Sequence, residues 1–261
     1  MKLVILCLVS LFSIAWGERP INDLVENNTQ FKHLNVKLTD IVNEDNLESF
    51  LEALKKFVQD GDVSGIFNLK MNPTIDEAID KLRAYFISCG FDPLELDDQK
   101  LQLLGIIGSI KLTSGWLQDI STISRNDDVI VSYNSATKKV AFTLPLKFNV
   151  LLFTYKYVTR VTLLKIKGDV LGKIQDVVMN LNLIFDGSTG KFVLKSVSMK
   201  DSGKITVKFS GHSLVDWITN AMTSVITEVL HPLLISMLQS GAMSVGNDIT
   251  DAVNEYIKNH F

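Results

Sequence analysis

The stretch VAFTLPLKFNVLLFTYKY, residues 140–157, decides the fold of this chain. From Val140 to Leu152 every second residue is large and apolar, which is the two-residue period of a β-strand with one buried face. The apolar positions then move to the other parity between Phe153 and Tyr157. A one-residue change of parity predicts a β-bulge inside one long strand.

Further strands are predicted on both sides of this stretch. Before it, apolar residues of one parity run from Leu104 to Trp116, and glycines within the run favour bulges and sharp bends. After it, alternating segments at 177–185, 192–199 and 205–209 are separated by turn sequences such as DGSTG. Short turns between alternating segments predict an antiparallel meander.

Helices are predicted at both ends of the sheet. Apolar residues recur at helical spacing over 45–60 and again after Thr74, which has the character of an N-cap, up to Gly90. From Ser213 a wide apolar stripe continues to the end of the chain, with Pro232 predicted to kink it. Four polar positions argue against a transmembrane span: Asp216, Asn220, Glu228 and His231. The fold class is therefore α+β.

The first residues have the pattern of a secretory signal peptide. Lys2 is followed by an apolar run that is too short to span a bilayer, and the small residues Ala15 and Gly17 predict cleavage after Gly17. We therefore expect a secreted, extracellular protein with a signal peptide at 1–17, an N-terminal helical extension at 18–72 and an α+β domain at 73–261. The sequon at Asn27 predicts a glycoprotein.

Composition narrows the classes of function. The chain is 46% hydrophobic and 21% charged, with a formal net charge of −3, which indicates a globular protein. No cluster of basic residues with interleaved aromatics is visible in the sequence, so nucleic acid is not an expected partner. Cys89 is the single cysteine after the signal peptide. We interpret it as a buried structural thiol, and a catalytic or dimer-forming thiol as the alternative.

The sequence offers little chemistry. The string GDVSG at 61–65 has its serine in the wrong place for a nucleophile elbow, and GSTGK at 187–191 lacks the spacing of a phosphate-binding loop. The four histidines are scattered, with no partner at metal-ligand spacing. These observations predict a protein that is not an enzyme and needs no metal or cofactor. A hydrolase whose residues meet only in the fold is the remaining alternative.

Several segments resemble one family in their order along the chain. They are IDEAID at 75–80, FDPLELDD at 91–98, GII at 105–107, WLQ at 116–118, IQDVVMNL at 174–181 and the helix from Leu214. Together they resemble the group 7 mite allergens and their insect relatives over about residues 74–258. Residues 18–72 depart from that family's pattern.

The resemblance implies a curved antiparallel sheet wrapped around a long C-terminal helix. This is the tubular lipid-binding architecture of the bactericidal/permeability-increasing and juvenile-hormone-binding proteins. It implies a secreted, non-enzymatic carrier of a lipid or other small apolar ligand, such as a fatty acid or terpenoid, in an elongated pocket. The hormone-binding and takeout-like branch carries an N-terminal disulfide, which this chain is unable to form.

The candidate ligand-binding residues are apolar side chains expected on the inner face of the sheet and on the helix stripe. They are Phe142, Leu144, Phe148, Leu152, Phe185 and Leu194 on the sheet, with Trp217, Ala221, Met222 and Val225 on the helix. Each is equally compatible with ordinary core. The alternative function is a membrane- or surface-active protein in transient contact with lipid, for which Lys138 and Lys139 are the only hint in the sequence.

Overall fold

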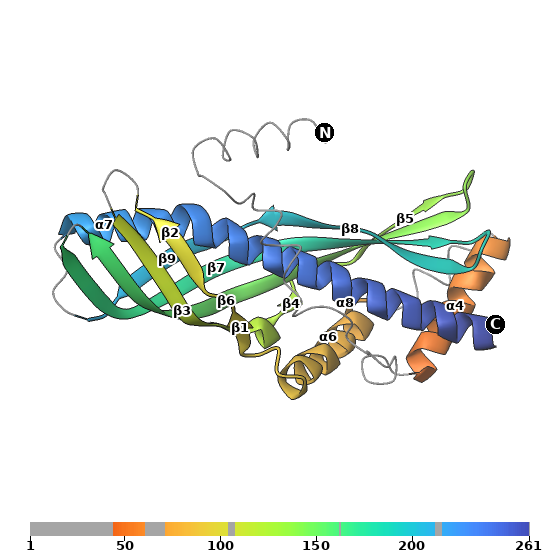
Figure 1. Cartoon of the computed structure of the whole chain (residues 1–261). Helices are drawn as coiled ribbons and strands as arrows, with labels where there is room; N and C mark the ends of the chain where they lie inside the picture. Colours follow the sequence, from red (N-terminus) through yellow and green to blue (C-terminus); the bar gives the residue numbers. More distant parts are fainter. Residues whose placement is uncertain (1–43, 61–70, 104–107, 162, 212–215, 261) are drawn as a thin grey trace.

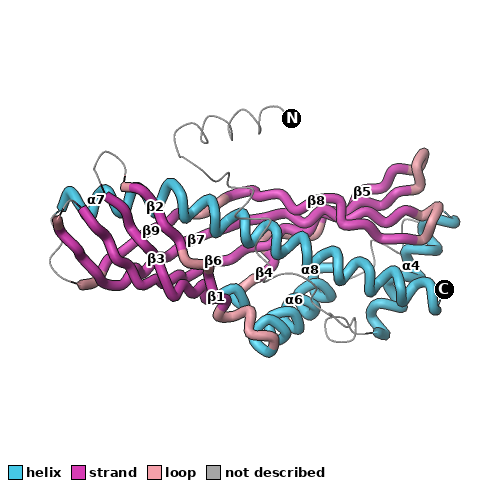
Figure 2. Tube along the Cα trace, viewed as in Figure 1, coloured by secondary structure: helices cyan, strands magenta, loops and turns pink. Residues whose placement is uncertain are grey.

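The structure is a computed structural model that describes residues 44–60, 71–103, 108–161, 163–211 and 216–260. A strongly curved antiparallel sheet forms one side of the molecule, and a long C-terminal helix lies along its concave face (Figures 1 and 2). The predicted fold class is confirmed. The signal peptide, the sequon at Asn27 and the family-like segment at 105–107 lie outside the described residues.

The described strands form a single sheet of nine strands. Neighbouring strands follow the order β1-β3-β6-β7-β8. In addition, β2 pairs with β3, β4 and β5 pair with β6, and β9 pairs with β7. The strands are β1 (Leu94–Leu96), β2 (Gln99–Gln102), β3 (Gly108–Gln118), β4 (Ser124–Arg125), β5 (Ile130–Asn134), β6 (Lys139–Val161), β7 (Leu164–Asp186), β8 (Lys191–Asp201) and β9 (Lys204–Phe209).

The centre of the sheet is a hairpin of two 23-residue strands, β6 and β7. The buried side of this hairpin changes halfway along it. Phe148 and Val177 form one buried cross-strand pair, and the next buried pair, Leu151 and Ile174, lies three residues further on instead of two. Asn149 and Asp176 are not paired at this level, but the register is the same on either side of them, so the predicted bulge in β6 is wrong. Instead the two paired strands rotate together beside Asp176, whose φ of 60° is one that aspartate tolerates.

A bulge does occur in β3, as the glycines predicted. The register with β6 shifts between Thr113 and Trp116, and Ser114 has a φ of 53°. The shift places Gly115 on the buried face and turns Trp116 outward, where 39% of it is exposed. The expectation that Trp116 shares the buried parity of Ile110 is therefore wrong.

The C-terminal helix is continuous from Asp216 to His260. It comprises α7 (Asp216–Val225), a π-helical turn η3 (Ile226–Leu230) and α8 (His231–His260). Proline lacks a backbone N–H, and its ring clashes with the carbonyl four residues earlier. The wider π-turn immediately before Pro232 accommodates both defects. The helix is long and apolar enough to cross a membrane, but half of its most apolar window is buried, as in a core helix.

Two further helices were predicted nearly in place. The first, α4 (Glu44–Asp60), buries Leu47, Leu51 and Leu54. The second, α6 (Met71–Ser88), begins before Thr74, so the predicted N-cap is wrong; Pro73 lies in the first turn, where its missing N–H costs nothing. A short 3₁₀ turn, η2 (Ile120–Thr122), follows β3.

The end of α6 explains two features of the sequence. Phe91 N–H donates to the Phe86 carbonyl (2.9 Å) and Gly90 N–H to the Ile87 carbonyl (3.2 Å), with a φ of 73° at Gly90. This is a Schellman cap, with the two phenylalanine rings in edge contact. Cys89 lies beyond the buried stripe and is exposed, so its predicted burial is wrong.

The FDP segment has a structural role. The Asp92 carboxylate accepts the backbone N–H groups of Asp119 (2.9 Å) and Ser121 (2.8 Å), and also the Ser121 hydroxyl. It thereby caps the η2 turn and ties the end of α6 to the end of β3. This part of a segment that contributes to the family resemblance therefore positions elements around the sheet.

Candidate functional site

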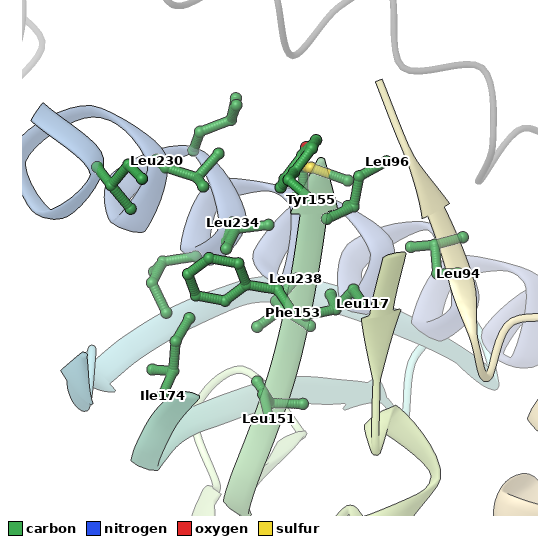
Figure 3. Packing of buried hydrophobic residues seen from close by; sticks show 14 of the residues in the cluster. Leu94, Leu96, Leu117, Leu151, Phe153, Tyr155, Ile174, Leu230, Leu234 and Leu238 are labelled. Atoms are coloured by element: carbon green, nitrogen blue, oxygen red, sulfur yellow. The ribbon is translucent and has the colours of Figure 1, made fainter. Parts of the chain in front are cut away.

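The candidate site is the apolar interior between the concave face of the sheet and the C-terminal helix. One continuous cluster of buried side chains fills it, contributed by β1, β3, β6, β7 and β8 on one side and by α7, η3 and α8 on the other. Figure 3 shows leucines of the helix facing Phe153, Tyr155 and Leu117 of the sheet. Such an interior offers a ligand hydrocarbon contact and little else.

Large aromatic rings lie flat over glycines on this face. A Cβ atom added to Gly172 would come within 1.8 Å of the Phe153 ring, and one on Gly115 within 2.2 Å of the Tyr155 ring. Tyr157 lies beside its cross-strand partner Gly168 in the same way. Glycine within a strand allows this close approach. The rings therefore form a thin layer on the sheet instead of projecting fully toward the helix.

The polar ends of these aromatic residues are satisfied at the margin of the interior. The Tyr155 hydroxyl donates to the Asp97 carbonyl (3.1 Å) and the Tyr157 hydroxyl to the Ser210 carbonyl (3.2 Å). Burial raises the pKa of both phenols, so they stay neutral. Thr159, which is fully buried, donates to the Ser109 carbonyl (3.1 Å). The interior thus has polar groups that are already paired.

The C-terminal half of the helix is tied to the edge strand β8 by polar contacts. Gln239 donates to the Val197 carbonyl (2.8 Å), and the Asn254 amide both accepts the Phe192 N–H and donates to the Phe192 carbonyl (2.8 Å each). Gly246 lets the helix approach Leu194 closely. These contacts satisfy part of the open edge of β8 and fix α8 against it.

The N-terminal half of the helix is held differently. Ile218, Met222, Val225 and Ile226 are fully buried, but within the described residues no hydrogen bond or ion pair joins 216–230 to the sheet. The first polar tether is His231, whose Nε2 lies 2.8 Å from the Ser202 carbonyl. Close backbone approaches are also concentrated on β8, with a few between the π-turn and β9. Apolar side chains alone hold α7 and η3.

The structure divides the predicted site residues among several places. Phe148, Leu194, Met222 and Val225 are buried in the interior cluster, and Leu144 packs against it. Phe142 and Phe185 belong to a second cluster under α4 with Leu54 and Phe192. Ala221 is half-buried.

The last two predicted residues are less enclosed. Trp217 is 49% exposed at the start of α7. Leu152 pairs with Lys173 and Gln118 on the convex face, because the buried side changes before it.

Sequence reasoning left out of the site a set of buried residues on the sheet side of the interior cluster. They are Ile110 and Leu112 of β3, Leu151, Phe153, Tyr155 and Tyr157 of β6, and Val170 and Ile174 of β7. The change of parity was visible in the sequence, but Leu151, Leu152 and Phe153 are all apolar, so the pattern did not locate it. The signal was Asn149, a polar residue in the middle of the run.

No group of three or more histidine, cysteine, aspartate or glutamate side chains gathers in metal-binding geometry in the part of the chain that the structure describes. A bidentate ion pair joins α6 to β4. Arg125 on β4 donates from Nε and Nη2 to the two Asp76 oxygens of α6 (2.9 Å each). This pair holds α6 beside the sheet and has no access to the apolar interior.

Comparison with known proteins gives a family and two solved structures with partial similarity. Takeout 1 from Epiphyas postvittana is 16% identical, with a TM-score of 0.33, over 72% of this chain and 90% of that one. Lipopolysaccharide binding protein is 15% identical, with a TM-score of 0.43, over 69% of this chain and 37% of that one. No curated protein matches the chain. The Group 7 allergen family model matches residues 70–250, as the resemblance predicted, and the chain therefore belongs to the Group 7 allergen family.

Proposed function

We propose that this protein binds a lipid or other small apolar ligand between the first half of its C-terminal helix and the concave face of the sheet. The observation that carries the proposal is the contrast along the helix. Its second half is tied to β8 by Gln239 and Asn254, whereas residues 216–230 contribute apolar side chains to the interior and make no hydrogen bond or ion pair to the described part of the sheet. An apolar ligand replaces such contacts without leaving a buried polar group unpaired.

The side chains around this region suit an adaptable site. Met222 is fully buried there, and methionine adjusts its shape to irregular neighbours. An alkyl chain gains about 0.8 kcal/mol for each buried methylene, so a twelve-carbon ligand gains about 10 kcal/mol before the costs of association. No catalytic group, metal or cofactor is needed. The ligand-binding residues proposed here are Phe148, Ala221, Met222 and Val225 from the sequence-based set, together with Phe153, Tyr155 and Ile174.

The proposal also includes secretion of the protein and the absence of catalysis. The N-terminal pattern supports secretion, with the signal peptide at 1–17, an extension at 18–72 and a lipid-binding domain at 73–261. The fold of the described residues supports a carrier more than a hydrolase, because buried apolar side chains dominate the interior and the Thr159 hydroxyl within it is already paired.

The test compares two substitutions on the same helix. The full chain is first analysed by native mass spectrometry for co-purified lipid. Saturated fatty acids of graded length are then titrated against a bound fluorescent fatty acid. Ala221→Trp fills the proposed site and is expected to weaken binding at least tenfold. Ala252→Trp, a matched half-buried alanine in the tied half, is expected to leave binding within twofold.

Three outcomes contradict the proposal. The first is the absence of saturable binding for any chain length. The second is binding that Ala252→Trp weakens and Ala221→Trp does not, which places the ligand beside β8. The third is binding that neither substitution changes while both proteins remain folded by circular dichroism.

A further inference from the structure

The convex face of the sheet near the β6–β7 turn carries an unusual concentration of positive charge. Arg160 on β6 lies directly opposite Lys165 on β7, and in the next row Val158 lies between Lys111 of β3 and Lys167 of β7. All four basic side chains are exposed. Like charges directly across a sheet destabilise it, so folding alone does not explain this arrangement.

Negative charge within the described residues compensates these groups only in part. Lys111 pairs with Asp98 (3.8 Å), but no ion pair in the described residues involves Arg160, Lys165 or Lys167. Asp169, another carboxylate on this face, lies opposite Lys156 and accepts the Ser210 hydroxyl (3.1 Å). Further down the same face come Lys173, Lys204 and Lys208. The positive face stands out in a chain whose formal net charge is −3.

Exposed apolar side chains accompany this charge. At the turn between β6 and β7, Leu163 is 101% exposed and Leu164 is 55% exposed. On the convex face, Trp116 and Leu171 lie in one row on either side of Thr154, with 39% and 52% of their surfaces exposed. Leucine at the tip of a turn and tryptophan beside lysines match the boundary between lipid headgroups and acyl chains.

We propose that this end of the sheet docks on an anionic lipid surface. Here "basic tip" denotes Arg160, Leu163, Leu164, Lys165 and Lys167. In the docked state Leu163 and Leu164 enter the acyl region, while the basic residues contact anionic headgroups and lose their mutual repulsion. Nucleic acid or a sulfated polysaccharide would match the charge, but neither accounts for two exposed leucines at the tip. The proposal is independent of ligand binding in the interior.

The experiment uses the full chain with its interior ligand neither added nor required. Sedimentation with vesicles of phosphatidylcholine alone is compared with vesicles containing 30% phosphatidylglycerol, at about 0.1 M and 0.5 M salt, a range over which exposed charges become screened. Binding is expected only to the anionic vesicles and is expected to weaken at the higher salt concentration.

Two pairs of variants separate charge from apolar insertion. Lys165→Gln/Lys167→Gln is expected to weaken anionic vesicle binding about 25-fold, since each basic residue near such a surface contributes about fivefold. Leu163→Ser/Leu164→Ser is expected to weaken it about tenfold or more. The controls, Lys195→Gln/Lys200→Gln on β8 and Ile130→Ser on β5, remove exposed residues elsewhere and are expected to leave binding unchanged.

Several outcomes of the vesicle experiment would overturn the docking proposal. Equal binding to both vesicle types, no binding to either, or an equal loss in the control variants overturns the proposal. Binding to heparin or DNA that exceeds vesicle binding and survives Leu163→Ser/Leu164→Ser overturns it in favour of a polyanion. Fatty acid titration of the same variants keeps this test separate from the interior site, because these exposed substitutions are expected to leave ligand affinity unchanged.

Discussion

The two halves of the C-terminal helix differ in how they meet the same sheet. From Gln239 to Asn254 the helix is fixed to the edge strand β8 by three side chain to backbone hydrogen bonds and by a close approach at Gly246. From Asp216 to Leu230 the helix makes no such hydrogen bond among the described residues. It contributes apolar side chains to the interior cluster, which also contains the aromatic rings that lie over glycines.

This contrast indicates which part of the interior is able to exchange protein contacts for ligand contacts. Hydrogen bonds to a strand edge are directional, so their loss leaves buried groups unpaired. Apolar contacts have no such direction, and one hydrocarbon surface replaces another at small cost. The π-turn and the His231 tether lie at the boundary between the halves.

The largest effect is expected from Gly172→Ala in the apolar half. The added methyl group would overlap the fully buried Phe153 ring, which is rigid and enclosed, so we expect a loss of about 3 kcal/mol in the free energy of unfolding. Gly246→Ala in the tied half meets only the flexible end of Leu194, and alanine favours the helix by about 1 kcal/mol, so we expect a change below about 1 kcal/mol. Urea unfolding measures both. A larger cost for Gly246→Ala would contradict the account of the aromatic layer.

A smaller effect is expected from Asn254→Ala. This change removes two hydrogen bonds to Phe192 and leaves its backbone groups unpaired, which costs about 1–2 kcal/mol. Asn247→Ala, an exposed position on the same helix, serves as the control and is expected to cost less than about 0.5 kcal/mol. Equal unfolding midpoints for the two variants would show that the amide does not fix the helix.

The smallest effect concerns the ion pair between α6 and β4. Hydrogen bonding to Arg125 lowers the pKa of Asp76. A lowered folded pKa means that the pair stabilises the protein above the unfolded pKa and that this contribution is lost as pH falls through the folded pKa. Because Asp76 is half exposed, solvent limits the contribution to less than about 1 kcal/mol. Between pH 6 and pH 3 the wild type should therefore lose slightly more stability than Asp76→Asn; an identical pH dependence would contradict this role.

Much of the fold was accessible from the sequence because its periodicity is strong. The alternation predicted β3, β6, β8, β9 and the second half of β7, and the helical stripes predicted α4, α6 and the C-terminal helix, whereas the short strands β1, β2, β4 and β5 were not predicted. The family resemblance predicted how the elements are assembled. The level along β6 at which the buried face changes was harder to predict. Three consecutive apolar residues, Leu151 to Phe153, hid the level at which the buried side changes, so Leu152 was assigned to the wrong face.

Contacts that depend on tertiary structure escaped prediction altogether. The aromatic rings that cover Gly115 and Gly172 belong to a different strand from these glycines, and no local pattern in the sequence links each ring to its glycine. The cluster of positive charge on the convex face was not predicted for the same reason, since it forms only when the strands pair. Arg160 and Lys165 are only five residues apart in a mixed sequence, but strand pairing aligns them with Lys111 and Lys167 on one side of the sheet. Phe142 and Phe185 look like central strand residues, yet α4 covers them at the far end.

The most direct test of the central claim is hydrogen exchange of the delipidated protein, measured by mass spectrometry with and without a saturating fatty acid. The account predicts that ligand slows exchange in 216–230 and in the facing segments 108–113 and 151–161, and leaves 239–260 unchanged. Slower exchange confined to 239–260, or a uniform change along the whole helix, would contradict the claim that the apolar half holds the ligand.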